Sequence, residues 1–162
     1  MENRKVRNAS KFEYNGITFK SKFEVTVYKT LVEKYKDVRY ERHTIVLVKP
    51  FTPTVPFYKH DARRGFKQDR ATVRPITYTP DFVVVKNRDL LIFEAKGFPN
   101  DIYPVKRKLF RAYLEGVKAR NIFNRIYFFE VKSKRDLIDA INVVESDERA
   151  EKISEGNQLA GN

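Results

Sequence analysis

The chain has 162 residues and a formal net charge of +12, and it contains no cysteine and only two histidines, His43 and His60. These counts exclude disulfides, a thiolate nucleophile, cysteine-bound zinc and a histidine-rich metal site. The six glycines are scattered singly, so no glycine-rich phosphate-binding loop is present, and no run of about 18 apolar residues predicts a membrane span. Because the first residues also lack the apolar stretch of a signal peptide, we expect a cytoplasmic protein.

The positive charge is unevenly distributed along the chain. Residues 1–144 hold 31 Lys and Arg against 16 Asp and Glu, whereas residues 145–162 hold 2 against 5. A body this basic indicates a polyanionic partner, most simply nucleic acid. The alternative is that the charge only keeps the protein in solution.

The first half of the chain predicts a hairpin, a helix and a strand after a basic arm at residues 1–10. An Asn-Gly turn signal inside residues 11–19 predicts a small hairpin. Apolar residues then recur every four positions, which predicts an amphipathic helix over residues 21–36. Residues 38–48 predict a strand, and residues 49–75 show no regular pattern.

The second half predicts a hairpin over residues 76–96, a helix over 103–120, a strand over 125–131 and a helix over 133–144 that begins with a capping-box-like Ser-Lys-Arg-Asp. A β-α-β connection favours a parallel strand pair. We therefore expect an α/β fold with a mixed sheet flanked by helices, in the order α-β-β-β-α-β-α. We expect a single domain that ends at residue 144 and an acidic, flexible tail at 145–162.

Two charged segments, Tyr-Thr-Pro-Asp-Phe and Phe-Glu-Ala-Lys-Gly, lie in the second hairpin on either side of a polar turn at Asn87 and Arg88. If the turn is centred there, residues whose numbers sum to 175 are opposite each other. Asp81 then faces Glu94 directly across the strand pair. Lys96 lies two residues beyond Glu94 and therefore on the same face.

Two carboxylates opposite each other destabilise a strand pair, and their neighbours in this hairpin are mostly apolar. A divalent cation would neutralise them. Mg²⁺ suits such a site because it needs few protein oxygens and keeps several of its waters. The plainer alternative is that Asp81, Glu94 and Lys96 are solvated at the ends of their strands.

With these residues on a mixed sheet, the chain resembles the PD-(D/E)XK nuclease superfamily, and most closely the phage Holliday-junction-resolving endonucleases. The resemblance rests on Pro80-Asp81, on Glu94-Ala95-Lys96 and on Glu24 in the first helix, and it covers about residues 11–131. It implies a restriction-endonuclease-like fold and Mg²⁺-dependent hydrolysis of phosphodiester bonds in DNA, with Mn²⁺ as a substitute metal. If the protein comes from a phage, the resemblance also implies that the protein is located in the cytoplasm of the host cell.

Cleavage of a phosphodiester requires charge neutralisation on the phosphoryl oxygens and a nucleophilic water. On this resemblance the catalytic residues are Glu24, Asp81, Glu94 and Lys96, and the metal ligands are Asp81, Glu94, the Ala95 carbonyl and Glu24. Lys96 acts either as a base or as an electrostatic clamp. Glu24 has an alternative role, because Ser-Lys-Phe-Glu at 21–24 also fits a capping box in which the glutamate only caps the helix.

Two basic stretches and two lysines that precede Glu24 are candidates for holding DNA. Contacts of this kind position a substrate without reading its sequence. The second stretch opens the helix after the Glu-Ala-Lys strand, so we expect it beside the site. The candidate residues are Lys20, Lys22, Arg63, Arg64, Lys67, Arg70, Lys106, Arg107, Lys108 and Arg111.

We therefore predict a Mg²⁺-dependent DNA endonuclease that acts on branched DNA, with the branch preference resting on the resemblance. A symmetric four-way junction would suit a homodimer with two sites. The alternatives are a recombination or repair exonuclease of the same fold, a restriction-like nuclease, and a catalytically silent nucleic-acid-binding module.

Overall fold

The computed structural model describes residues 11–96 and 102–160, so the arm at 1–10 and Gly97 of the second motif lie outside the described residues. The fold belongs to the α/β class and divides into two compact units. The first unit comprises residues 1–41, 80–98 and 123–162, and the second comprises 42–79 and 99–122. The sequence pattern gives no sign of this division, because it arises from pairings between strands that are far apart in the chain.

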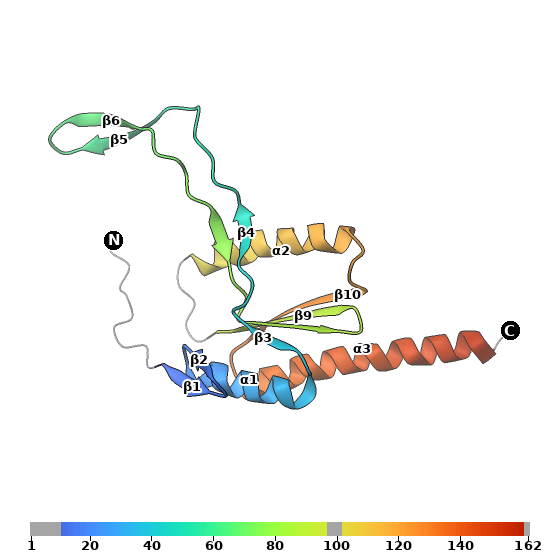
Figure 1. The fold of residues 1–162 in the computed structure, drawn as a ribbon. Coiled ribbons are helices and arrows are strands. Elements are labelled where there is room, and N and C mark those ends of the chain that lie inside the picture. Colours follow the sequence, from blue (N-terminus) through green and yellow to red (C-terminus); the bar gives the residue numbers. More distant parts are fainter. Residues whose placement is uncertain (1–10, 97–101, 161–162) are drawn as a thin grey trace. The chain divides into compact units, whose positions relative to one another are not determined.

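The first unit is built on a four-stranded mixed sheet (Figure 1). The strand order is β10-β9-β8-β3, with β10 parallel to β9 and the other neighbours antiparallel. The mixed sheet and the parallel pair formed across the second helix are therefore confirmed. The elements of this unit are β1 (Phe12–Tyr14), β2 (Ile17–Phe19), α1 (Lys22–Lys34), β3 (Val38–Tyr40), β8 (Phe82–Lys86), β9 (Asp89–Ala95), β10 (Arg125–Val131) and α3 (Lys134–Ala160).

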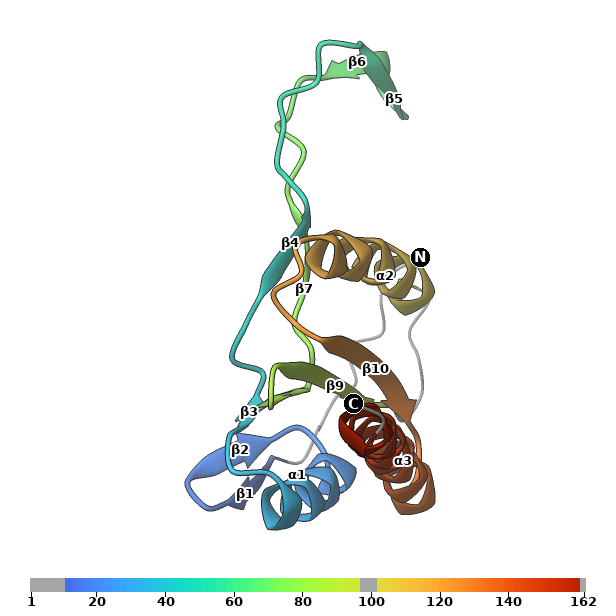
Figure 2. The ribbon, with the colours of Figure 1, turned by 90° about the vertical axis from the view of Figure 1, so that its right-hand side faces the viewer.

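Helices α1 and α3 cover the same face of this sheet (Figure 2). Alternation along the strands places every second side chain on that face. Each large apolar side chain buried there contributes about 1.5–3 kcal/mol to stability. The fully buried side chains of this core include Phe19, Val27, Leu31, Phe82, Val84, Leu91, Phe93, Val131, Leu137 and Val144.

Both helices begin where the capping signals predict. The Ser21 hydroxyl accepts a hydrogen bond from the Glu24 backbone N–H at 3.1 Å, which caps α1. The Ser133 hydroxyl accepts from the Asp136 N–H at 3.1 Å, and the Asp136 carboxylate accepts from the Ser133 N–H at 3.1 Å. These reciprocal bonds satisfy N–H groups that a helix leaves without partners in its first turn.

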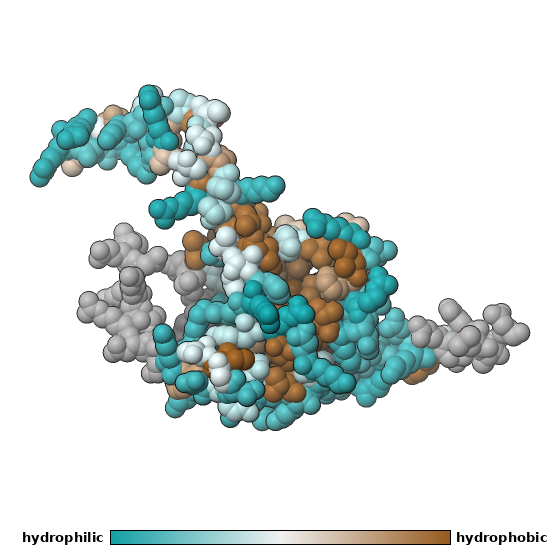
Figure 3. Space-filling model, viewed as in Figure 1, coloured by the Kyte–Doolittle hydropathy of each residue, from teal (hydrophilic) through white to brown (hydrophobic). Residues whose placement is uncertain are grey.

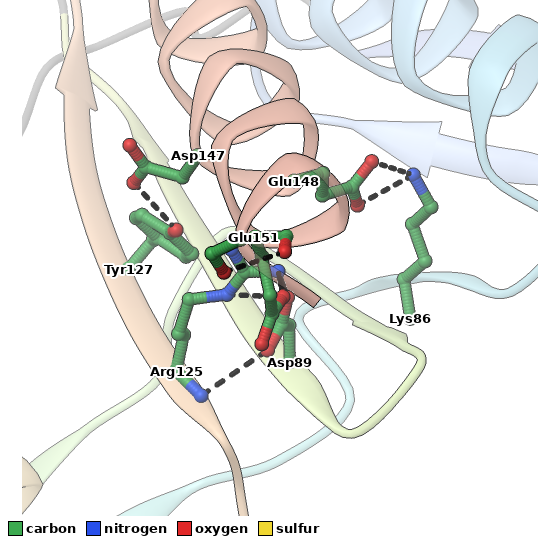
Figure 4. A network of polar contacts seen from close by, with 8 residues as sticks. Lys86, Asp89, Arg125, Tyr127, Asp147, Glu148 and Glu151 are labelled. Atoms are coloured by element: carbon green, nitrogen blue, oxygen red, sulfur yellow. Dashed lines mark hydrogen bonds and ion pairs between the residues drawn. The ribbon is translucent and has the colours of Figure 1, made fainter. Parts of the chain in front are cut away.

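The expected helix end at residue 144 is wrong, because α3 continues to Ala160, whereas the expected flexibility of the segment stays a prediction. The acidic side chains of this segment have partners on β8 and β10 (Figure 4), and Glu145 pairs with Lys34 on α1. Partly exposed ion pairs each contribute only about 0–1 kcal/mol, and the sequence pattern does not show them. The pairs are Lys34–Glu145, Tyr127–Asp147 at 2.7 Å, Lys86–Glu148 at 2.7 Å and Arg125–Glu151 at 3.2 Å.

The second unit contains two strand pairs and one helix. Strand β4 pairs antiparallel with β7, and β5 pairs antiparallel with β6. The rings of Tyr78 and Phe110, both buried, lie 4.4 Å apart and hold β7 against α2. The elements are β4 (Ile45–Val48), β5 (Phe57–Asp61), β6 (Gly65–Asp69), β7 (Ile76–Tyr78) and α2 (Tyr103–Ala119).

Three expectations about the middle of the chain are wrong. The strand predicted over 38–48 is two strands, because Glu41 has a left-handed φ of 42° and β3 and β4 pair with different partners. The hairpin predicted over 76–96 contains only β8 and β9, since β7 pairs with β4. Residues 49–75 are not irregular, because they contain β5 and β6. Neither strand has an apolar buried face, so neither shows the alternation of apolar and polar residues that predicts a strand.

Candidate active site

The β8–β9 hairpin has the register that its turn predicts. Asn87 and Arg88 have φ values of 50° and 64°, the left-handed conformation that a two-residue hairpin turn requires. The strand pairing runs from Lys86↔Asp89 to Phe82↔Phe93, so the numbers of opposite residues sum to 175. The next position along this register places Asp81 opposite Glu94 at the open end of the hairpin.

Asp81 is held by the backbone of the opposite strand. The Ala95 N–H donates to Asp81 Oδ2 at 2.8 Å. Burial, and then the negative charge of Glu94, raise the pKa of Asp81 to about 7, against the lowering effects of the Ala95 N–H and Lys96. The pKa rises because two carboxylates lie close together where little water solvates them.

Glu94 and Lys96 complete the group on the same face of β9. The Glu94 side chain is 3% exposed, and the Lys96 ammonium lies 2.7 Å from Glu94 Oε1. The prediction that Lys96 shares the face of Glu94 is confirmed. By the alternation of the strands, this face is opposite the one that packs on α1 and α3.

Glu24 lies in the first turn of α1 and its side chain is hydrogen-bonded to the residues around the start of the helix. Its buried carboxylate accepts hydrogen bonds from the Lys20 N–H at 2.9 Å, the Ser21 hydroxyl at 3.2 Å and the Tyr40 hydroxyl at 2.5 Å. The Ser21 half of the expected capping box is present, whereas the Glu24 carboxylate bonds the N–H of Lys20, one residue before the N-cap. Glu24 is also close enough to Asp81 to raise the pKa of that carboxyl. The expected catalytic and metal-binding role of Glu24 stays a prediction.

Tyr40 and Glu41 also lie near Asp81 and Glu24, and the sequence did not predict them there. The Glu41 N–H donates to the Asp81 carbonyl at 2.9 Å, and the Glu41 carboxylate forms an ion pair with Lys20. Burial lowers the pKa of Lys20, but Glu41, Asp81 and Glu24 outweigh that effect and raise it. No local pattern could identify these contacts, since they arise from the pairing of β3 with β8, about 40 residues later.

The carboxylates fit one hard divalent cation with few protein ligands. In the two described stretches, no group of three or more His, Cys, Asp or Glu side chains is arranged to hold a metal ion. Mg²⁺ needs fewer, because it keeps several waters and binds through one or two carboxylates. Asp81 and Glu94 supply these two, with the Ala95 carbonyl in the same segment.

The basic residues expected to hold DNA lie in both units. Lys20 and Lys22 flank Ser21 at the start of α1, and the Lys22 ammonium is 5.7 Å from the centre of the Phe12 ring. The expectation that the α2 group lies beside the site stays a prediction. The residues of the second unit are Arg63, Arg64, Lys67 and Arg70 in and after the β5–β6 hairpin, and Lys106, Arg107, Lys108 and Arg111 on α2.

Comparison with known proteins gives one match. The profile of the family described as "Protein of unknown function (DUF1064)" matches residues 4–130. The chain belongs to this family. The matched residues include every expected catalytic residue and both strands of the β8–β9 hairpin.

No curated protein and no solved structure matches the chain. Of the helices among the residues that the structure describes, none has the length and apolar character needed to cross a membrane.

Proposed function

We propose that the protein is a metal-dependent endodeoxyribonuclease of the PD-(D/E)XK type, with a restriction-endonuclease-like fold, that cleaves branched DNA such as four-way junctions. The observation that carries the proposal is the convergence of Asp81, Glu94 and Lys96 on one face of two adjacent strands. A structural role alone does not account for it, because the arrangement places the partly buried carboxylate of Asp81 opposite the buried carboxylate of Glu94.

The first unit supports this assignment. The resemblance implies a mixed sheet that carries the acidic residues on a central hairpin, and here β8 and β9 are the two inner strands of the sheet. The parallel β10 and the helix α1 that bears Glu24 occur in the expected chain order.

The carboxylates of Asp81 and Glu94 would hold the cation, with the Ala95 carbonyl as a neutral ligand. A bound Mg²⁺ would neutralise charge on the phosphoryl oxygens and activate a water molecule. The Ala95 N–H orients one oxygen of Asp81, so this carboxylate is already fixed before any ligand binds. Such preorganisation avoids rearrangement during the reaction.

Lys96 would stabilise negative charge at the scissile phosphate. Its ammonium contacts Glu94 at 2.7 Å and its side chain is 22% exposed, so it is both positioned by the site and accessible from outside. A lysine is a compact positive charge suited to a phosphate oxygen. In the proposed enzyme Lys96 either clamps the phosphate through its ammonium or acts as a base, a role in which its uncharged amine accepts the proton of the attacking water.

The basic surface supports DNA as the substrate. Residues 1–144 carry nearly twice as many Lys and Arg as Asp and Glu, and the exposed cations lie on both units. Preference for branched DNA, and a homodimer that presents two sites to a two-fold junction, rest on the resemblance and on symmetry.

The test is cleavage of four labelled substrates: a four-way junction, a linear duplex, a single strand and a covalently closed circle, each with Mg²⁺, Mn²⁺ or EDTA. We expect cleavage of the junction, and of the closed circle wherever it forms a branch, when Mg²⁺ or Mn²⁺ is present. We expect no cleavage in EDTA. An exonuclease would leave the closed circle intact, and cleavage in EDTA would contradict the metal requirement.

Asp81→Asn is the matched inactive variant, because the asparagine oxygen can still accept the Ala95 N–H bond while the charge is lost. We expect a loss of cleavage of at least about 10²–10³-fold, with junction binding equal or tighter. A folded variant that cleaves at the wild-type rate would contradict the site assignment.

One observation favours a second candidate, a catalytically silent nucleic-acid-binding module. The oxygens of Glu24 are engaged by three hydrogen-bond donors, as in a purely structural cap. The same cleavage assay separates the candidates, since the silent module binds the junction in every metal condition and cleaves in none.

A further inference from the structure

The β5–β6 hairpin belongs to the second unit, and the side chains of this hairpin do not pack into a hydrophobic core. All five residues of β5 are exposed, and in the described parts of the chain β5 pairs with β6 alone. Within its unit, the hairpin lies at the end of two extended segments that lead away from β4 and β7 (Figure 1). A hairpin without a buried face is only marginally stable in water. Its exposed side chains are therefore available to a partner.

One face of the hairpin is aromatic. The register pairs Tyr58 with Gln68 and His60 with Phe66, so these side chains share a face, and Phe57 lies on the other. Tyr58 is 52% exposed and Phe66 is 74% exposed. The His60 and Phe66 rings lie edge to face with centres 5.3 Å apart. We call Tyr58, His60 and Phe66 the aromatic face.

The tip of the hairpin presents two arginines. Gly65, with a φ of 69°, closes a three-residue loop opposite Asp61. The Asp61 carboxylate accepts the backbone N–H groups of Arg63 at 2.9 Å and Arg64 at 3.0 Å. These bonds fix the loop, while the Arg63 and Arg64 side chains are exposed.

The charge of the hairpin favours a polyanion. Residues 57–74 contain six Lys and Arg against two Asp, and both aspartates are engaged within the hairpin, Asp61 in the loop and Asp69 with Lys59 and the Ala71 N–H. The surface of this region is mainly of the hydrophilic colour in Figure 3, with isolated hydrophobic residues. A second copy of the same face would be repelled by its own charge, whereas phosphates would be attracted.

We propose that the β5–β6 hairpin binds DNA at unpaired bases, with Tyr58 and Phe66 stacking on the bases and Arg63 and Arg64 contacting phosphates. The inference rests on the proposed function in taking DNA as the partner, and it adds the form of DNA that is recognised. Base faces are covered by their neighbours in an intact duplex and become accessible in single strands and at opened branch points. Aromatic side chains stack on any base, so the contact tolerates every sequence.

The test measures the affinity for a fluorescent single-stranded oligonucleotide, a four-way junction and a linear duplex, in EDTA so that no cleavage occurs. We expect Tyr58→Ala with Phe66→Ala to weaken single-strand binding by at least about 30-fold and to leave the salt dependence unchanged. Arg63→Ala with Arg64→Ala should instead reduce the slope of log affinity against log salt by about 1.4. Phe57→Ala is the matched control, since this ring is on the same strand, 58% exposed and on the opposite face, and its affinity should equal that of the wild type.

The inference is overturned if the Tyr58/Phe66 variant binds single strands as Phe57→Ala does, or if it loses duplex and single-strand affinity equally. Loss of self-association in sedimentation, with DNA binding intact, would assign the face to a second copy. Melting temperatures equal to the wild type exclude unfolding as the cause of a loss. If the wild type cleaves junctions while the aromatic variant binds normally, only this inference fails; if the wild type binds no DNA, the proposed function fails with it.

Discussion

Asp81 couples the candidate site to the stability of the protein. Its pKa is raised from the ordinary value of 3.8 to about 7, first by burial and then by Glu94. Between these two values the folded state holds a proton that the unfolded state has released, so the fold loses stability as the pH rises. Three pKa units correspond to at most about 4 kcal/mol.

We therefore expect the stability difference between Asp81→Asn and the wild type to grow in favour of the variant from about pH 4 to pH 7, because asparagine has no proton to lose. The measurement is urea unfolding of both proteins across this range in EDTA. Parallel pH profiles for the two proteins would contradict the raised pKa of Asp81.

The role of Glu24 in cleavage needs a separate test, because this residue forms hydrogen bonds at the start of α1 whether or not it also acts in cleavage. Glu24→Gln keeps a side-chain acceptor for the Lys20 N–H and removes the charge near Asp81. We expect near-normal stability with a single-turnover rate about 10²–10³-fold lower, as for the loss of one electrostatic stabiliser. The measurements are the melting temperature and single-turnover cleavage at saturating Mg²⁺.

Tyr40→Phe is the matched control for Glu24→Gln, because it removes the 2.5 Å hydrogen bond to Glu24 but keeps the carboxylate. Its cleavage rate should remain much closer to the wild type. A wild-type rate for Glu24→Gln would confine Glu24 to the helix cap and leave Asp81, Glu94 and Lys96 to carry the chemistry.

At the scale of elements, α2 combines a buried side with a row of cations near its start. Phe110 and Leu114 are buried, whereas Arg111 is exposed and the Arg107 guanidinium lies 5.8 Å from the centre of the Tyr103 ring. The apolar side keeps the helix in place, so replacing the cations should change binding without unfolding the unit.

Neutralising Lys106, Arg107 and Arg111 together should reduce the slope of log affinity against log salt by up to about 3 for duplex DNA, since each phosphate contact contributes about 0.9. The measurement is a salt titration of junction binding in EDTA. The control replaces Lys118 and Arg120 at the other end of α2, which should leave the slope near the wild-type value. An unchanged slope for the triple variant would remove α2 from the DNA surface.

At the scale of the whole molecule, a junction-cleaving enzyme needs two sites to cut two strands, and the chain has one group of Asp81, Glu94 and Lys96. We therefore expect a homodimer. Co-expressed wild-type and Asp81→Asn chains should form mixed dimers that nick a supercoiled cruciform plasmid in one strand, whereas wild-type dimers should linearise it. A protein that sediments as a monomer both with and without the junction would contradict this expectation.

Features that depend on neighbouring residues could be predicted from the sequence. The turn at Asn87 and Arg88 predicted the register that opposes Asp81 and Glu94, and the serines at 21 and 133 predicted the helix starts. These features are determined by backbone conformation, side-chain alternation and hydrogen bonds within a few residues. The hydrogen bonds between Ser21 and Glu24 were predictable for the same reason, because the two residues are only three positions apart.

Features that depend on distant partners were decided only by the tertiary structure. The pairing of β3 with β8 brings Tyr40 and Glu41 to the site, and the pairing of β4 with β7 separates the second unit from the first. The acidic end of the chain continues α3, and its carboxylates pair with cations on α1, β8 and β10. Contacts between segments so far apart in the chain produce no local pattern in the sequence. Each of these polar side chains could equally well be exposed to solvent.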